Sequence, residues 1–158
     1  MAAVRRVLVV ANRTVGGVEL AEAIGDRLAA GPCEFHLLVP VPPTPPIGIA
    51  AGFSAMEAGV VPALQGPDER VLAHERLEFG LQWMRGLGAE VDGEVGDTDA
   101  VRAVRAVVDV RPVDEIIIST LPTTISRWLR QDLPHRVERK FSVPVTVVTA
   151  ARAPADSR

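Results

Sequence analysis

Short apolar runs alternate with helical patterns along this chain, and that alternation constrains its fold more than any other feature. Strand-like runs occupy residues 6–11, 34–39, 90–95, 114–119 and 143–148. The first run is β-branched and lacks polar alternation, which is typical of a strand covered on both faces in a parallel sheet. The run at 90–95 alternates carboxylates with Val91, Gly93 and Val95, which predicts a half-exposed strand at a sheet edge.

Helical spacing of apolar residues fills the intervals between these runs. It predicts a helix from Val18 that stops at Gly31, a second over residues 68–87, and a third capped by Asp97 or Thr98. A further stripe over 125–137 breaks at Pro134, which fits the first position of a separate final helix. Strands that alternate with helices predict an α/β fold, with helices on both faces of an open parallel sheet.

One domain over residues 1–149 accommodates the 158-residue chain, with 150–158 as a flexible tail. Residues 40–66 form a long Pro/Gly-rich loop that exceeds a simple connector. The net charge of −3 argues against binding to nucleic acid or to an anionic membrane, and no apolar stretch is long enough for a spanning helix. The single cysteine, Cys33, fits a reducing compartment, and we expect a cytoplasmic protein.

Two loops at the expected carboxyl ends of strands have the chemistry to hold an anion. Gly16 and Gly17 stand at a helix start, where Thr14 can cap the helix or contact a phosphate; a plain turn and cap is the favoured interpretation. Residues 119–126 hold five hydroxyls and precede a basic segment. Phosphate binding and simple capping beside solvated arginines both explain this second loop.

No catalytic or metal-binding set stands out. Ser54 lies in a G-x-S motif without the final glycine of a nucleophile elbow. A charged strand edge and a helix cap explain the four carboxylates near the end of the third strand better than a Mg²⁺ site: Asp92, Glu94, Asp97 and Asp99. His74 and His135 lie in helical patterns without ligand spacing, and His36, inside the second strand, is expected to be a satisfied core or sheet-face residue.

Five stretches together resemble the universal stress protein family. They are residues 6–14 (RVLVVANRT), 35–40 (FHLLVP), 95–100 (VGDTDA), 114–119 (DEIIIS) and 136–148 (RVERKFSVPVTVV). The resemblance implies a three-layer fold with five parallel strands in the order 3-2-1-4-5. It also implies a homodimer formed through the last strand, which starts at Val143 and ends at Val148.

The same resemblance locates a nucleotide site but indicates that its usual form is missing. The implied binding positions are Asn12, Thr14, Val39, Ser119, Thr120, Thr124, Ser126 and Arg127. Family members that bind ATP carry an aspartate where this chain has Asn12, and a glycine motif where residues 119–132 contain no glycine. Without glycines the backbone cannot approach a triphosphate closely, so we expect no ordinary ATP cradle. ATP or another adenine nucleotide in a different pose stays an alternative.

Three uses of the chain follow from these observations. The preferred hypothesis is a non-catalytic, regulatory binding protein of the universal stress type with weak or no ATP binding. The alternative is a small-molecule or nucleotide-binding enzyme with residues 40–66 as a lid. In a third interpretation, the apolar side chains of residues 40–66 contact a protein partner.

Overall fold

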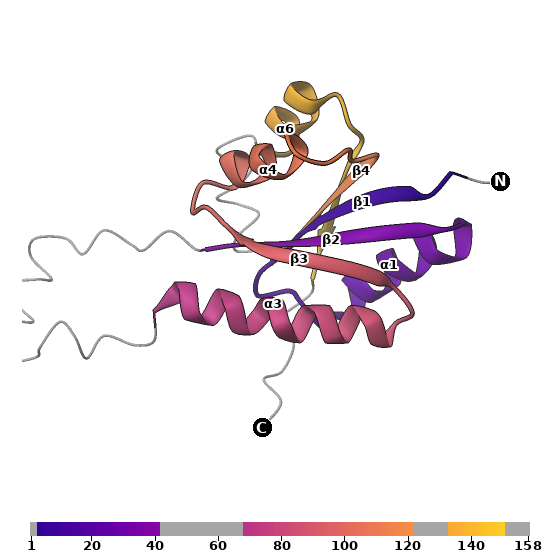
Figure 1. Cartoon of the computed structure of the whole chain (residues 1–158), viewed down its shortest axis with the longest axis horizontal. Coiled ribbons are helices and arrows are strands. Elements are labelled where there is room, and N and C mark those ends of the chain that lie inside the picture. Colours follow the sequence, from indigo (N-terminus) through magenta and orange to yellow (C-terminus); the bar gives the residue numbers. More distant parts are fainter. Residues whose placement is uncertain (1–2, 42–67, 122–132, 151–158) are drawn as a thin grey trace, which may run out of the picture.

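The computed structural model describes residues 3–41, 68–121 and 133–150 (Figure 1). Its five strands are β1 (Arg5–Val10), β2 (Cys33–Pro40), β3 (Glu90–Gly96), β4 (Glu115–Thr120) and β5 (Val145–Thr149). Its helices are α1 (Val18–Ala30), α3 (Glu69–Gly86), α4 (Ala100–Val108) and α6 (Leu133–Phe141). Each matches an element expected from the sequence, and most bounds agree within three residues.

All neighbouring strands are parallel, and their order is β3-β2-β1-β4-β5. The chain therefore has the open α/β sheet that the sequence predicts, and β3 lies at an edge as expected. Because β1 pairs with both β2 and β4, the order of strands reverses beside it. The carboxyl ends of β1 and β4 flank this switch point, where ligands bind in open α/β sheets.

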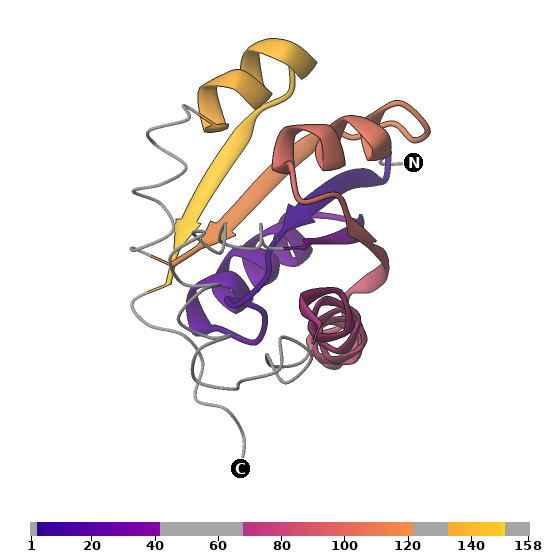
Figure 2. The ribbon, with the colours of Figure 1, turned by 90° about the vertical axis from the view of Figure 1, so that its left-hand side faces the viewer.

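Helices cover both faces of the sheet (Figure 2). On one face, Val7 and Val9 of β1 pack in a core shared with residues of α1 and α3. On the other face, Leu8 and Val10 pack in a second core with residues of α4 and α6. Successive side chains of a strand point to opposite faces, so the unbroken apolar run of β1 fills both cores.

Helix α3 lies close against β2 because it carries a glycine at the contact. A Cβ atom at Gly80 would meet Leu37 Cδ2 at 2.5 Å and Val15 Cγ1 at 2.9 Å. At these separations any larger side chain displaces its neighbours. Gly80 therefore sets the spacing between α3 and the sheet.

A buried carboxylate joins three elements near the amino end of β4. The side chain of Glu115 is 4% exposed and accepts hydrogen bonds from Arg27 Nε at 2.9 Å and Nη2 at 2.6 Å. Arg5 Nη2 lies 3.0 Å from its other oxygen. Two guanidinium groups thus compensate a charge that burial alone would make costly.

The cap of α4 and the start of the last strand differ from their predicted positions. Helix α4 is capped by Asp99, whose side chain accepts from the N–H groups of Val101 and Arg102, and the expectation of Asp97 or Thr98 as the cap is wrong. Asp97 instead accepts from the Asp99 N–H in the preceding turn, and this backbone hydrogen bond lowers the pKa of Asp97. The last strand begins at Val145, after Pro144, since proline has no N–H to donate to the sheet.

Pro134 is the second residue of α6, close to the expected start of a final helix. In the described ranges, no helix is both long and apolar enough to cross a membrane. The predicted long loop lies outside the described residues from position 42 onward, as do the hydroxyl-rich segment beyond Leu121 and the tail after Ala150.

Candidate functional site

Asn12 follows β1 at the switch point, and its side chain is held from two sides. Its Nδ2 donates to the carbonyl oxygen of Pro40, at the end of β2, over 2.7 Å. Its Oδ1 accepts a 2.6 Å hydrogen bond from Arg76 Nη1, which reaches across from α3. Both ends of the amide are therefore engaged within the protein.

Two buried hydroxyls bridge the neighbouring strand ends. Ser119, in β4, donates from Oγ to Thr14 Oγ1 over 2.8 Å, and both residues are 2% exposed. The expectation that Thr14 caps α1 is wrong, because Gly17 is the N-cap and no side chain bonds to the helix start. The turn before it includes Gly16 at φ +91°, a backbone conformation that favours glycine.

The other described positions of the implied nucleotide site are also enclosed. Val39 is fully buried in the core beneath α1 and α3, so it presents no side-chain surface to a ligand. Thr120 is 2% exposed and donates from its hydroxyl to the carbonyl oxygen of Leu121 over 3.3 Å. Three further positions lie outside the described residues: Thr124, Ser126 and Arg127.

The structure thus places Asn12, Thr14, Ser119 and Thr120 at the carboxyl ends of β1 and β4, and it pairs their polar groups internally. Sequence reasoning missed Arg76. The apolar stripe of α3 indicated which face of this helix is buried. It did not indicate that the Arg76 guanidinium, beside the stripe, would reach the end of β1. Only the crossing of α3 over the sheet brings Arg76 to Asn12.

Metal and thiol chemistry find little support in the described residues. Within residues 3–41, 68–121 and 133–150, no three His, Cys, Asp or Glu side chains are grouped to hold a metal ion. Cys33 is half-buried and donates from Sγ to the Arg27 carbonyl oxygen over 3.3 Å. Burial raises the pKa of the Cys33 thiol, which opposes formation of the reactive thiolate.

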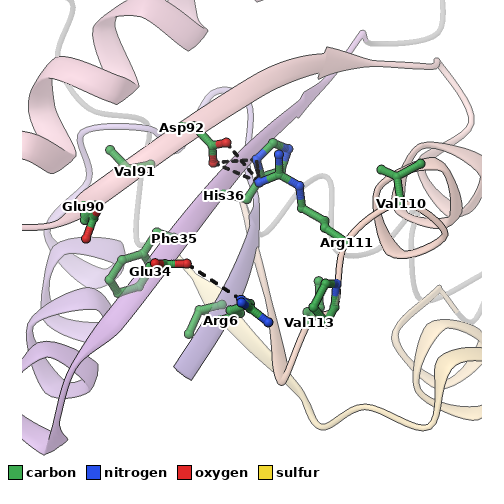
Figure 3. Close-up of a pocket in the computed structure, with 12 residues that line it drawn as sticks. Arg6, Glu34, Phe35, His36, Glu90, Val91, Asp92, Val110, Arg111 and Val113 are labelled. Carbon is green, nitrogen blue, oxygen red and sulfur yellow. Dashed lines mark hydrogen bonds and ion pairs between the residues drawn. The ribbon is translucent and has the colours of Figure 1, made fainter. Parts of the chain in front are cut away.

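A pocket of about 530 Å³ lies at the opposite, amino end of the sheet, on the face that carries α4 (Figure 3). Its floor includes Arg6 of β1, Glu34 and His36 of β2, and Glu90 and Asp92 of β3. Residues 110–113, between α4 and β4, form its wall. Sequence reasoning placed His36 on a strand face, which is confirmed, but it did not identify this pocket.

His36, Asp92 and Arg111 form a polar cluster at this pocket. His36 Nδ1 lies 2.8 Å from Asp92 Oδ1, and Arg111 Nη1 lies 3.1 Å and 3.0 Å from the two Asp92 oxygens (Figure 3). Burial raises the pKa of Asp92, but hydrogen bonds from His36 and Arg111 outweigh it and leave that pKa below its ordinary value. Asp92 is therefore a charged link between the sheet edge and the 110–113 segment.

Comparisons of sequence found no matching family model and no matching curated protein. Comparisons of structure did find matches. A universal stress protein in complex with cAMP has a TM-score of 0.58 at 15% identity, covering 95% of this chain and all of that one. A universal stress protein from Archaeoglobus fulgidus has a TM-score of 0.55 at 11% identity, covering 91% and 93%.

A third structure, of a hypothetical protein, has a TM-score of 0.54 at 15% identity, covering 95% of this chain and 99% of that one. At such low identity the likeness concerns the fold. The chain has the universal stress protein fold, in agreement with the resemblance seen in its sequence.

Proposed function

We propose that this chain is a non-catalytic, regulatory binding protein of the universal stress type that acts in the cytoplasm and binds ATP weakly or not at all. The observation that carries the proposal is the occupied state of Asn12, whose amide is hydrogen-bonded to Arg76 and to the Pro40 carbonyl. A nucleotide that used Asn12 would have to replace these contacts.

The cost of that replacement supports the proposal. A hydrogen bond to a charged group contributes about 1.5–3 kcal/mol, and an ordinary one about 0.5–1.5 kcal/mol. Breaking the buried hydrogen bond between Ser119 and Thr14 would cost a further amount, in the range of an ordinary hydrogen bond. The binding free energy of a ligand is what remains after the free energy of these lost hydrogen bonds is subtracted from that of its own contacts. Affinity at this site is therefore low.

One protein that shares the fold is described in complex with cAMP, so this fold can hold an adenine nucleotide. A fair test therefore includes a cyclic nucleotide beside ATP. Purified protein is titrated calorimetrically with Mg-ATP, AMP and cAMP, and ATP turnover is measured in parallel.

Absence of binding heat up to millimolar ATP, together with no turnover, agrees with the proposal. One-to-one binding of ATP at micromolar concentration contradicts it. The hydroxyl-rich loop would then be responsible, and Thr124→Ala and Arg127→Ala would reduce the affinity. ATP turnover by a variant that lacks these two side chains would also contradict the proposal, because it would show that the protein is catalytic.

We also propose a homodimer through β5. This strand pairs only with β4 in the described sheet, and Val147 is 37% exposed on it. Val147→Lys places a charge at the sheet edge, where it opposes strand pairing. Analytical ultracentrifugation should show a dimer for the wild type and for Val18→Lys, an exposed position on α1, but a monomer for Val147→Lys. A monomeric wild type contradicts the proposal.

A further inference from the structure

The ring of His36 lies between charged side chains that ask opposite things of one nitrogen atom. The side chain of His36 is 6% exposed, and its Nδ1 lies 2.8 Å from Asp92 Oδ1 and 2.9 Å from Arg111 Nη1. Its Nε2 lies 3.7 Å from Glu94 Oε2. A ring nitrogen carries either a proton or a lone pair, so Nδ1 can donate to Asp92 or accept from Arg111, but it cannot do both.

In the neutral ring these surroundings favour the tautomer with the proton on Nε2. That proton lies toward the Glu94 carboxylate, and Nδ1 accepts a hydrogen bond from Arg111. Arg111 Nη1 also donates to the Asp92 carboxylate, so it holds both acceptors. The other tautomer would turn the Nε2 lone pair toward a carboxylate oxygen, and two acceptors that face one another repel.

Protonation of the ring changes the sign of the contact with Arg111. Nδ1 then donates to Asp92 Oδ1, and a positive ring faces Glu94. Arg111 Nη1, 2.9 Å from Nδ1, meets a second donor with a positive charge and is repelled. Burial raises the pKa of Asp92, but hydrogen bonds from His36 and Arg111 keep it below its ordinary value, so this carboxylate is charged whether the ring is neutral or positive.

The other charged side chains near the ring belong to the strands beside it. Arg6 of β1 lies 3.8 Å from Glu34 of β2, and Glu90 of β3 adds a further negative charge at the same pocket. The side chains that α4 packs on this face of the sheet are apolar: Val101, Ala103, Val104 and Val107. Carboxylates therefore outnumber guanidinium groups around the ring, and a positive ring has partners of opposite charge.

The segment that carries Arg111 is anchored by its backbone at both ends. The Arg111 N–H donates to the Val107 carbonyl oxygen over 3.0 Å, and the Asp114 N–H donates to the Arg6 carbonyl oxygen over 2.8 Å. Between these anchors, the Arg111 side chain links the segment to β2 and β3 (Figure 3). This link can open while the helix before it and the strand after it stay intact.

We propose that His36 is a pH-sensitive switch that controls whether the Arg111 side chain is attached to β2 and β3. When the ring is neutral, Arg111 is bonded to His36 and Asp92, and residues 110–113 are held against the sheet. When the ring takes up a proton, His36 donates to Asp92 in place of Arg111, and residues 110–113 loosen at the wall of the amino-end pocket. The switch lies at the opposite end of the sheet from the nucleotide crevice, so it does not depend on the function proposed above.

The first test determines where the ring protons are in the full-length protein. Two-bond ¹H–¹⁵N spectra of imidazole rings distinguish the two neutral tautomers from the charged form. Because histidines ordinarily change charge between about pH 5 and pH 8, spectra are recorded across that range. At the upper end, the proton of His36 should be on Nε2. A proton on Nδ1 overturns the proposal, since Arg111 would then have no acceptor on the ring, and so does a ring whose charge stays the same throughout.

The second test follows the attachment of Arg111 itself. The order of its Cδ–Hδ bonds, measured by ¹³C relaxation, should be high at pH 8 and should fall along the titration curve of the His36 ring. His36→Gln removes the titrating group, so the order should then be the same at both ends of the range. His74→Gln, at an exposed histidine of α3, should behave as the wild type does.

Order at Arg111 that does not change with pH in the wild type overturns the proposal. An equal loss of order in His36→Gln does so as well, because another group would then be responsible. The wild-type titration decides by itself if the buried substitution prevents folding, since the loss of order must coincide with the protonation of the ring.

Discussion

Arg76 Nη1 donates a 2.6 Å hydrogen bond to Asn12 Oδ1, joining α3 to the end of β1 across 64 positions of sequence. The contact is part-buried and charge-assisted, so we expect it to contribute to folding as well as to engage the Asn12 side chain. A double-mutant cycle of Arg76→Ala and Asn12→Ala should give a coupling free energy of about 1–3 kcal/mol in urea unfolding. Additive single effects would contradict this, and Arg70→Ala, at an exposed arginine of the same helix, serves as the control.

The buried Glu115 predicts unequal effects of its two arginine partners. Arg27→Ala leaves the charge of Glu115 poorly compensated, and removing one partner of a buried pair costs about 3–5 kcal/mol. The side chain of Arg5 is 48% exposed, so Arg5→Ala should cost about 1 kcal/mol or less. Denaturant unfolding of both variants measures the difference. Equal losses would show that Arg5 compensates the charge as well as Arg27 does.

Replacing a helical glycine with alanine should change the stability of the protein in opposite directions at two positions. Gly80→Ala places a methyl group 2.5 Å from Leu37 Cδ2, and overpacking of this kind costs about 1–3 kcal/mol. Gly25→Ala in α1 meets nothing within 4 Å, and it should stabilise the protein by about 0.5–1 kcal/mol through helix propensity. Thermal unfolding of the two variants gives the comparison. A stabilised Gly80→Ala would mean that α3 can move away from the sheet at little cost.

Asp92 gives the stability of the protein an acid-sensitive component. Its pKa is lower in the folded state than the value of about 3.9 expected in the unfolded chain. The stabilisation is therefore complete above that value and is lost as the pH falls through the folded pKa, because the unfolded state takes up the proton first.

Asp92→Asn should flatten the acid limb of the stability–pH curve, measured by urea unfolding from pH 6 downward. Arg111→Ala removes one of the two side-chain donors, so its curve should lie between those of the wild type and Asp92→Asn. An acid limb that is the same in wild type and Asp92→Asn would contradict the role of this carboxylate.

Most of the fold could be predicted because its signals are local. The apolar run of β1, the alternation of β3 and the prolines at strand ends each depend on neighbouring residues, and they led to the correct elements. The cap of α4 was misplaced because three candidates, Asp97, Thr98 and Asp99, lie side by side. Only the hydrogen bonds of Asp99 to Val101 and Arg102 distinguish them.

The site was less predictable because its contacts are long-range. Sequence spacing placed Asn12, Thr14 and Ser119 at the carboxyl ends of strands, as observed. It could not show that Ser119 pairs with Thr14 across 105 positions, nor that Arg76 reaches Asn12. The amino-end pocket escaped notice for the same reason, since its floor combines three strands that are separated in sequence.

The central place of β1 determines when the sheet can be completed as the chain emerges during synthesis. One half, β1 with β2 and β3, consists of consecutive strands and can pair early. On its other side, β1 can pair only after β4 has been synthesised. The Arg6 N–H, for example, donates to Asp114 Oδ2 across 108 positions. Contacts of such long range slow folding. Until they form, β1 presents an unpaired apolar edge, and the nascent chain is most exposed to misassociation during that interval.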